Sequence, residues 1–85
     1  MERQYPIAYI GEEFEYFSYK VWDYDRCEYI IPNNALIYAT VLQVSRNHFT
    51  GEYVYKIRKD FPSGWVDEAW YTKGEVEKMK EAKIE

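Results

Sequence analysis

The sequence contains one cysteine, Cys27, and one histidine, His48, the side chains most often used as a nucleophile and a general base. Nucleophilic catalysis needs the base beside the nucleophile and a third group that orients the base. The spacing of this chain points to no such third residue. We therefore interpret Cys27 as a small buried apolar side chain and His48 as a turn residue, and we expect a protein without catalytic residues.

Two aspartates separated by one residue, Asp23 and Asp25, are the next candidates for chemistry, with Glu28 close behind them. Calcium loops need a longer series of oxygen ligands, a glycine at the sharp turn and a closing bidentate glutamate. This segment has none of that spacing. We interpret it as a solvated turn and expect neither a metal ion nor a cofactor.

Aromatic side chains make up 20% of the 85 residues. Alternation along a strand turns only about half of its residues inward, so a small core cannot enclose every ring. We expect the surplus to form a partner-binding face, and the rings assigned to it are Tyr16, Trp22, Tyr24, Trp65 and Trp70. The alternative is that the rings fill a thin core edge-on, with their polar atoms reaching water.

The formal net charge is −4, and the excess of carboxylates lies in the first third of the chain. An acidic chain without a dominant basic stripe is a poor sequence-blind DNA binder. The expected acidic edge beside the rings consists of Glu12, Glu13, Asp23 and Asp25. This edge predicts another protein with a basic surface as the partner, and a small cationic ligand held by the rings is a further alternative.

One local cluster of cations keeps nucleic acid open as an alternative partner. Arg46, Lys56, Arg58 and Lys59 lie on one expected hairpin, with Tyr53 or Tyr55 beside them. Such a patch could hold a single nucleic-acid strand by stacking and charge. The competing interpretation is an ordinary solvated face.

The elements that must position these residues are mainly strands. Runs of aromatic and β-branched residues between turn formers predict strands over residues 5–10, 14–24, 27–31, 36–44, 53–58 and 65–71. The segment Thr72-Lys73-Gly74-Glu75 matches a capping box and predicts a helix over residues 73–83. The expected core comprises Phe17, Val21, Ile31, Ala39, Val41, Val44, Tyr55, Ile57, Val66 and Met79.

These elements predict one domain, residues 1–85, of the mainly β class: a small, strongly bent antiparallel sheet or barrel with a short C-terminal α-helix. The succession Ala39–Val44, Tyr53–Ile57 and Trp65–Glu68 resembles the central hairpin and following strand of SH3-like barrels, including the Tudor-type branch. Residues Tyr9–Phe14 are similar to the "G-D-x-V" segment that enters such barrels. The resemblance implies the fold and not the function. The long run 14–24 and the C-terminal helix depart from the pattern, so closure could be incomplete.

A lone cysteine cannot form an intramolecular disulfide, which favours a reducing, cytoplasmic setting. The first residues are too polar for a signal peptide, and no apolar run approaches the roughly 18–20 residues that span a bilayer. We expect a binding module for protein–protein recognition, of a size that suits a phage or mobile-element accessory protein. Homo-oligomer formation through an uncovered sheet edge stays open.

Overall fold

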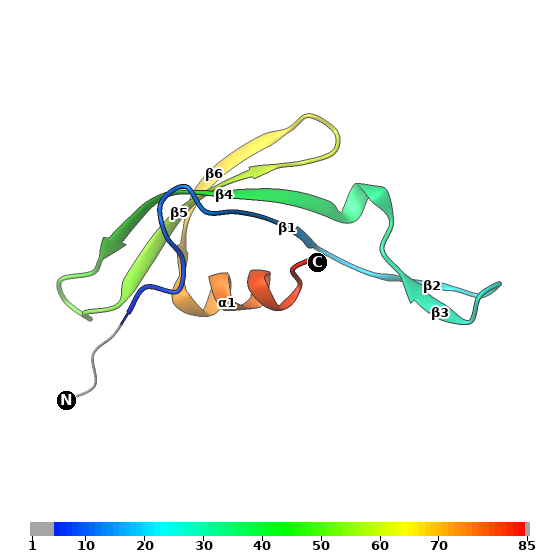
Figure 1. The fold of residues 1–85 in the computed structure, drawn as a ribbon, viewed down its shortest axis with the longest axis horizontal. Coiled ribbons are helices and arrows are strands. Elements are labelled where there is room, and N and C mark those ends of the chain that lie inside the picture. Colours follow the sequence, from blue (N-terminus) through cyan, green and yellow to red (C-terminus); the bar gives the residue numbers. More distant parts are fainter. Residues whose placement is uncertain (1–4, 85) are drawn as a thin grey trace.

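The computed structural model describes residues 5–84, which form a four-stranded antiparallel sheet, a separate two-stranded sheet and one helix (Figure 1). The elements are β1 (Glu13–Phe17), β2 (Val21–Asp23), β3 (Glu28–Ile30), η1 (Asn33–Ala35), β4 (Leu36–Arg46), β5 (Tyr53–Asp60), β6 (Val66–Thr72) and α1 (Lys73–Glu81). The larger sheet has the order β1-β4-β5-β6, and β2 pairs with β3. Helix α1 lies along one face of the larger sheet (Figure 1).

The predicted mainly β class with a short C-terminal helix is confirmed, in the form of an open sheet. Strands β1 and β6 occupy opposite edges, so the described strands do not close into a barrel. The edge at β1 is covered by the end of the chain: Ile84 donates its backbone N–H to the Glu15 carbonyl at 2.9 Å, and Lys83 pairs with Tyr16. The C-terminal segment thus occupies the edge at which a barrel would close.

Strand alternation places the core on the sheet face under α1. Val41, Tyr55 and Ile57 from the two central strands are fully buried, and Val76 and Met79 of the helix pack against them. The expected core residues that are buried are Ala39, Val41, Tyr55, Ile57 and Met79. The central hairpin and the helix therefore supply the interior much as their sequence pattern predicts.

The other five expected core residues are not buried, and they are spread over several elements. Phe17, Ile31 and Val44 are only partly covered, while Val21 and Val66 are 39% and 43% exposed. In β1 the even positions, Phe14 and Tyr16, face the helix. Both faces of that run carry aromatic residues, so the sequence pattern could not decide which face would be covered. Buried residues that the prediction missed are Ala8, Phe14, Tyr16, Ala35, Ile37 and Val76.

Two of the expected strands differ from the structure: one is absent and one is interrupted. Residues 5–10 form no strand, because Pro6 has no N–H to pair and the chain turns at Gly11, where φ is 88°. The expected strand 14–24 is interrupted at Ser18, whose backbone N–H and hydroxyl donate to the Ala35 carbonyl at 2.9 and 3.2 Å. Residues after Ser18 therefore leave the larger sheet and form β2.

The capping box at the start of α1 is confirmed. The Glu75 N–H donates to the Thr72 hydroxyl at 3.4 Å, and the Thr72 N–H donates to the Glu75 carboxylate at 3.2 Å. The helix ends at Glu81 and not at residue 83, because the residues that follow it pair with β1. The capping box at its start and the pairing with β1 after its end therefore fix the helix relative to the sheet.

The segment before β1 is held between β5 and α1. Ile7 donates its backbone N–H to the Tyr55 hydroxyl at 2.9 Å, and its carbonyl accepts from the Lys80 ammonium. Lys80 also forms an ion pair with Glu12 at 2.7 Å, and Ala8 is fully buried.

Among residues 5–84, no helix is long and apolar enough to cross a membrane.

Replacing Tyr55 by phenylalanine is expected to destabilise the fold by about 1–2 kcal/mol, because the partly buried Ile7 N–H loses its acceptor. The measurement is the free energy of unfolding from urea titration. The control is Tyr53→Phe, which removes the same group from a partly buried ring on the same strand. Equal stability of Tyr55→Phe and the wild type would show that this hydrogen bond contributes nothing.

Candidate functional site

Residues 21–30, named here the arm, form a two-stranded hairpin that projects from one end of the molecule (Figure 1). Strands β2 and β3 are joined by a turn at residues 24–27. The projection gives the molecule extents of 52 × 31 × 20 Å. Among the described residues, the two strands of the arm make their principal contacts with each other.

Three aromatic rings cluster on the arm. Trp22 lies directly opposite Tyr29, with ring centroids 5.0 Å apart and planes at 77°. Tyr24 meets the same indole at 6.5 Å and 81°. These are edge-to-face contacts, which stabilise aromatic pairs beyond the area that they bury. The rings nevertheless remain 42%, 84% and 65% exposed for Trp22, Tyr24 and Tyr29.

Carboxylates lie on the same hairpin as this ring cluster. Asp23 accepts from the backbone N–H of Asp25 at 3.0 Å and lies 3.8 Å from the Arg26 guanidinium. With Glu28 included, the arm holds three carboxylates and one cation, a net charge of −2. The predicted solvated turn at Asp23 is confirmed. The arm therefore combines exposed rings with negative charge.

Cys27 ends the arm's turn, and its placement corrects one expectation. The residue is exposed and not buried, and its backbone has a φ of 53°, in the left-handed region. His48 lies in the turn between β4 and β5, at the opposite end of the molecule (Figure 1). The fold does not bring these two side chains together.

The predicted aromatic face is divided among several places. Tyr16 is only 6% exposed and lies under α1, so its assignment to an exposed face is wrong. Trp65 is in the turn between β5 and β6, and Trp70 is on the sheet face that α1 leaves uncovered. Of the five predicted rings, only Trp22 and Tyr24 come together. The prediction missed Tyr29, although its place in the return strand opposite Trp22 was a usable signal.

The predicted acidic edge is divided as well. Asp23 and Asp25 lie on the arm, whereas Glu12 pairs with Lys80 against the helix. Glu13 accepts a short hydrogen bond from the Tyr38 hydroxyl on the uncovered face. Of the four, only the two aspartates therefore lie on the hairpin that carries the exposed ring cluster.

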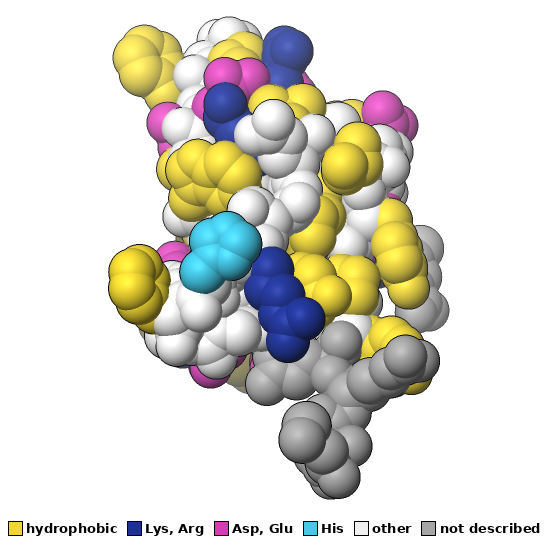
Figure 2. Space-filling view, turned by 90° about the vertical axis from the view of Figure 1, so that its left-hand side faces the viewer, with side chains coloured by type: hydrophobic (Ala, Val, Ile, Leu, Met, Phe, Trp, Pro, Cys, Tyr) yellow, Lys and Arg dark blue, Asp and Glu magenta, His cyan; other side chains and the backbone are white. Residues whose placement is uncertain are grey.

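The predicted basic patch is separated by strand alternation. Lys56 and Arg58 face the uncovered side of the sheet, while the adjacent Lys59 must face the helix side. Arg58 pairs with Asp60 at 3.2 Å, and Arg46 lies over the Tyr53 ring at 5.7 Å. Figure 2 views the end that holds the β4–β5 turn, and the Lys and Arg side chains there stand apart from one another.

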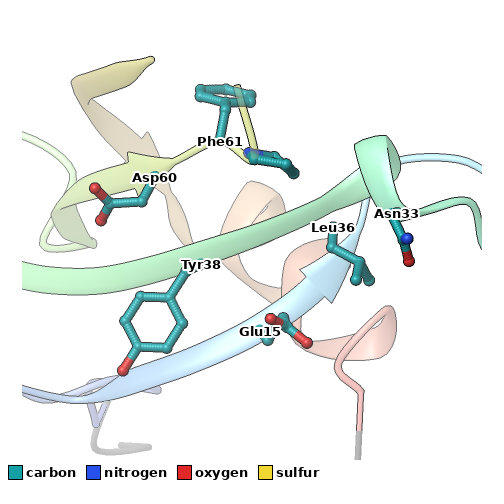
Figure 3. Close-up of a pocket in the computed structure, with 7 residues that line it drawn as sticks. Glu15, Asn33, Leu36, Tyr38, Asp60 and Phe61 are labelled. Atoms are coloured by element: carbon teal, nitrogen blue, oxygen red, sulfur yellow. The ribbon is translucent and has the colours of Figure 1, made fainter. Parts of the chain in front are cut away.

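The uncovered face contains an open hollow of about 430 Å³. Leu36, Tyr38 and Phe61 provide its apolar surfaces, and Glu15 and Asp60 place carboxylates beside them (Figure 3). The hydrogen bond to Glu13 raises the pKa of Tyr38 above its ordinary value. Among residues 5–84, no group of three or more His, Cys, Asp or Glu side chains is arranged to hold a metal ion. The hollow matches the arm in combining aromatic and acidic groups.

Lys59 lies on the helix side between two phenols. Its ammonium is 4.5 Å from the centroid of the Tyr71 ring, and Tyr16 lies near enough to affect its charge. Burial opposes the positive charge, but these phenols outweigh it, and the pKa of Lys59 is raised. Burial raises the pKa of Tyr16 as well, against the opposing effect of Lys59.

Comparison with known proteins yields no match to a family model, to a curated protein or to a solved structure. The resemblance to SH3-like barrels stays a prediction. The function must be argued from the surface of this chain.

The backbone amides of the arm are expected to exchange with solvent at least about 100-fold faster than those of Val41 and Ile57, because an isolated two-stranded hairpin is marginal in water. Trp22→Ala should accelerate arm exchange further while changing the global free energy of unfolding by less than about 0.5 kcal/mol. Residue-resolved hydrogen exchange measures both. Equal protection of the arm and the central strands would contradict the separation of the two.

The free energy of unfolding is expected to fall above about pH 10, because groups whose pKa is higher in the folded state stabilise it only below that range. Both Tyr16 and Lys59 act in this direction. Tyr16→Phe should reduce the alkaline decline in urea midpoints between pH 8 and 11. The control is Tyr24→Phe, whose ring is 84% exposed and which should retain the wild-type decline. An unchanged decline in Tyr16→Phe would contradict the role of this phenol.

Proposed function

We propose that the protein is a non-catalytic binding module that recognises a basic surface of another protein through the arm. The observation that carries the proposal is the exposed cluster of Trp22, Tyr24 and Tyr29 on a hairpin that the larger sheet does not support. Large exposed rings that are gathered in one place are the usual anchors of protein interfaces.

The energetics of the arm favour a partner that covers its rings. Tyr and Trp present a large contact area and have few rotatable bonds, so their immobilisation costs little entropy. The rings already hold one another edge-to-face, which prepares them for contact. A partner seated on them would also stabilise a hairpin that is marginal by itself.

Charge indicates the chemistry of that partner. The arm carries a net charge of −2 and the chain −4, so a positively charged surface is attracted and a phosphate backbone is repelled. The contact can extend toward the hollow with Glu15 and Asp60, since Asn33 and Leu36 of its lining lie a few residues after the arm in the chain. Both places offer aromatic groups beside carboxylates.

Trp22→Ala and Tyr29→Ala are expected to weaken binding to the partner at least about tenfold, since each removes a central anchor. The matched control is Trp65→Ala, which removes an equally large ring that is 69% exposed but lies outside the arm. Tagged wild-type and variant proteins are used to capture proteins from nuclease-treated native extract, and the bound proteins are quantified by mass spectrometry. Basic proteins should be retained by the wild type and the Trp65 variant and lost from the two arm variants.

Equal retention by the arm variants would contradict the proposal. The nucleic-acid alternative is measured directly by titrating the purified protein with a fluorescent oligothymidylate at low and high salt. Saturable binding that falls steeply with salt and is lost in a Lys56→Ala/Arg58→Ala variant would favour nucleic acid as the partner.

A further inference from the structure

A second hollow lies on the helix side of the sheet, between α1 and strands β1, β4, β5 and β6. Its volume is about 500 Å³, within the range of small-molecule sites. The sheet contributes Tyr16, Lys59 and Tyr71 to its lining, and the helix contributes Lys78 and Met79. It is thus formed on the covered face of the sheet, beside the core.

Lys59 gives this hollow a cation that forms an ion pair with no carboxylate in the described part of the chain. The residue follows Tyr55 and Ile57 at the next inward position of β5, so its ammonium is brought toward the interior. No carboxylate of residues 5–84 lies within 4 Å of it, although Asp67 is its cross-strand neighbour. The side chains that line the hollow beside it, Tyr16 and Tyr71, are phenols and not carboxylates. A partly buried charge that only neutral groups satisfy is well placed to receive an anion.

The remaining lining determines the size of the charge and the nature of the ligand body. Lys78 adds a second cation at the rim, and Glu75 is a carboxylate already engaged with Thr72 in the capping box. The lining therefore carries a formal charge of +1, which matches one negative charge better than two. Most of the other lining side chains are apolar: Phe17, Ile37, Phe61, Met79 and Ala82.

We propose that this hollow binds a small organic anion in which one carboxylate is attached to an apolar body. The carboxylate accepts hydrogen bonds from the Lys59 ammonium and from the hydroxyls of Tyr16 and Tyr71. The apolar body lies between the helix residue Met79 and Phe61 at the end of β5. This site is independent of the arm, and its occupancy is separable from partner binding.

The test is titration of the isotopically labelled protein with octanoate, followed by nuclear magnetic resonance. Octanamide, the neutral analogue of the same shape, and inorganic phosphate serve as comparison ligands. We expect saturable shifts at Lys59, Tyr71 and Met79 with octanoate, at least about tenfold weaker binding of octanamide, and no saturable shifts with phosphate. Equal affinity for octanoate and octanamide, preference for phosphate, or no saturable binding of octanoate would overturn the proposal.

Lys59→Met tests the role of the ammonium while it preserves most of the side-chain length. We expect octanoate affinity to fall at least about tenfold in this variant. The matched control is Lys56→Met, on the same strand but facing the uncovered side, which should bind octanoate as the wild type does. Unchanged affinity in Lys59→Met, or an equal loss in Lys56→Met, would contradict the site. Should Lys59→Met fail to fold, the comparison of octanoate with octanamide on the wild type tests whether the hollow recognises the carboxylate.

Discussion

The structure depends on the contact between one nine-residue helix and one face of a four-stranded sheet. Val76 and Met79 are the buried residues of α1, and they close the core over Tyr55 and Ile57. A single short helix can cover only one face of the sheet, so the other face is in contact with solvent or with a partner. The capping box at Thr72 and the pairing of Lys83 with β1 hold this helix in place.

The same constraint explains why so many rings are exposed. An interior closed by one helix accommodates Phe14, Tyr16 and Tyr55 among the rings, while Trp22, Trp65 and Trp70 remain between 42% and 69% exposed. Burial of all the aromatic residues would need a second layer on the uncovered face. The chain instead extends residues 21–30 away from the sheet as the arm and gathers three rings there. Part of the surplus aromatic surface is thus gathered where it is accessible to another molecule.

The two proposed sites lie on different parts of this architecture and have opposite charge. The arm is negative and exposed, and its rings lie on a hairpin that pairs with no strand of the larger sheet. The hollow at Lys59 is open and has a positive lining, and it is built on a strand that supplies the core. A ligand in that hollow would contact the helix and the covered face of the sheet, whereas a partner on the arm would lie away from both. Binding at one site therefore leaves the contacts of the other unchanged.

Local patterns in the sequence determined the central hairpin, the capping box, the start of α1 and the turn at Asp23, because strand alternation, capping and turn hydrogen bonds act between residues close in the chain. They also indicated an excess of rings. Only the tertiary structure decided that Tyr16 faces the helix and that the run 14–24 is interrupted at Ser18. It also decided which face of the sheet Lys59 shares with the helix and which face Lys56 and Arg58 leave open. Those outcomes depend on which face of each strand is covered, and on the hydrogen bonds from Ser18 to the distant Ala35 carbonyl, which no local pattern encodes.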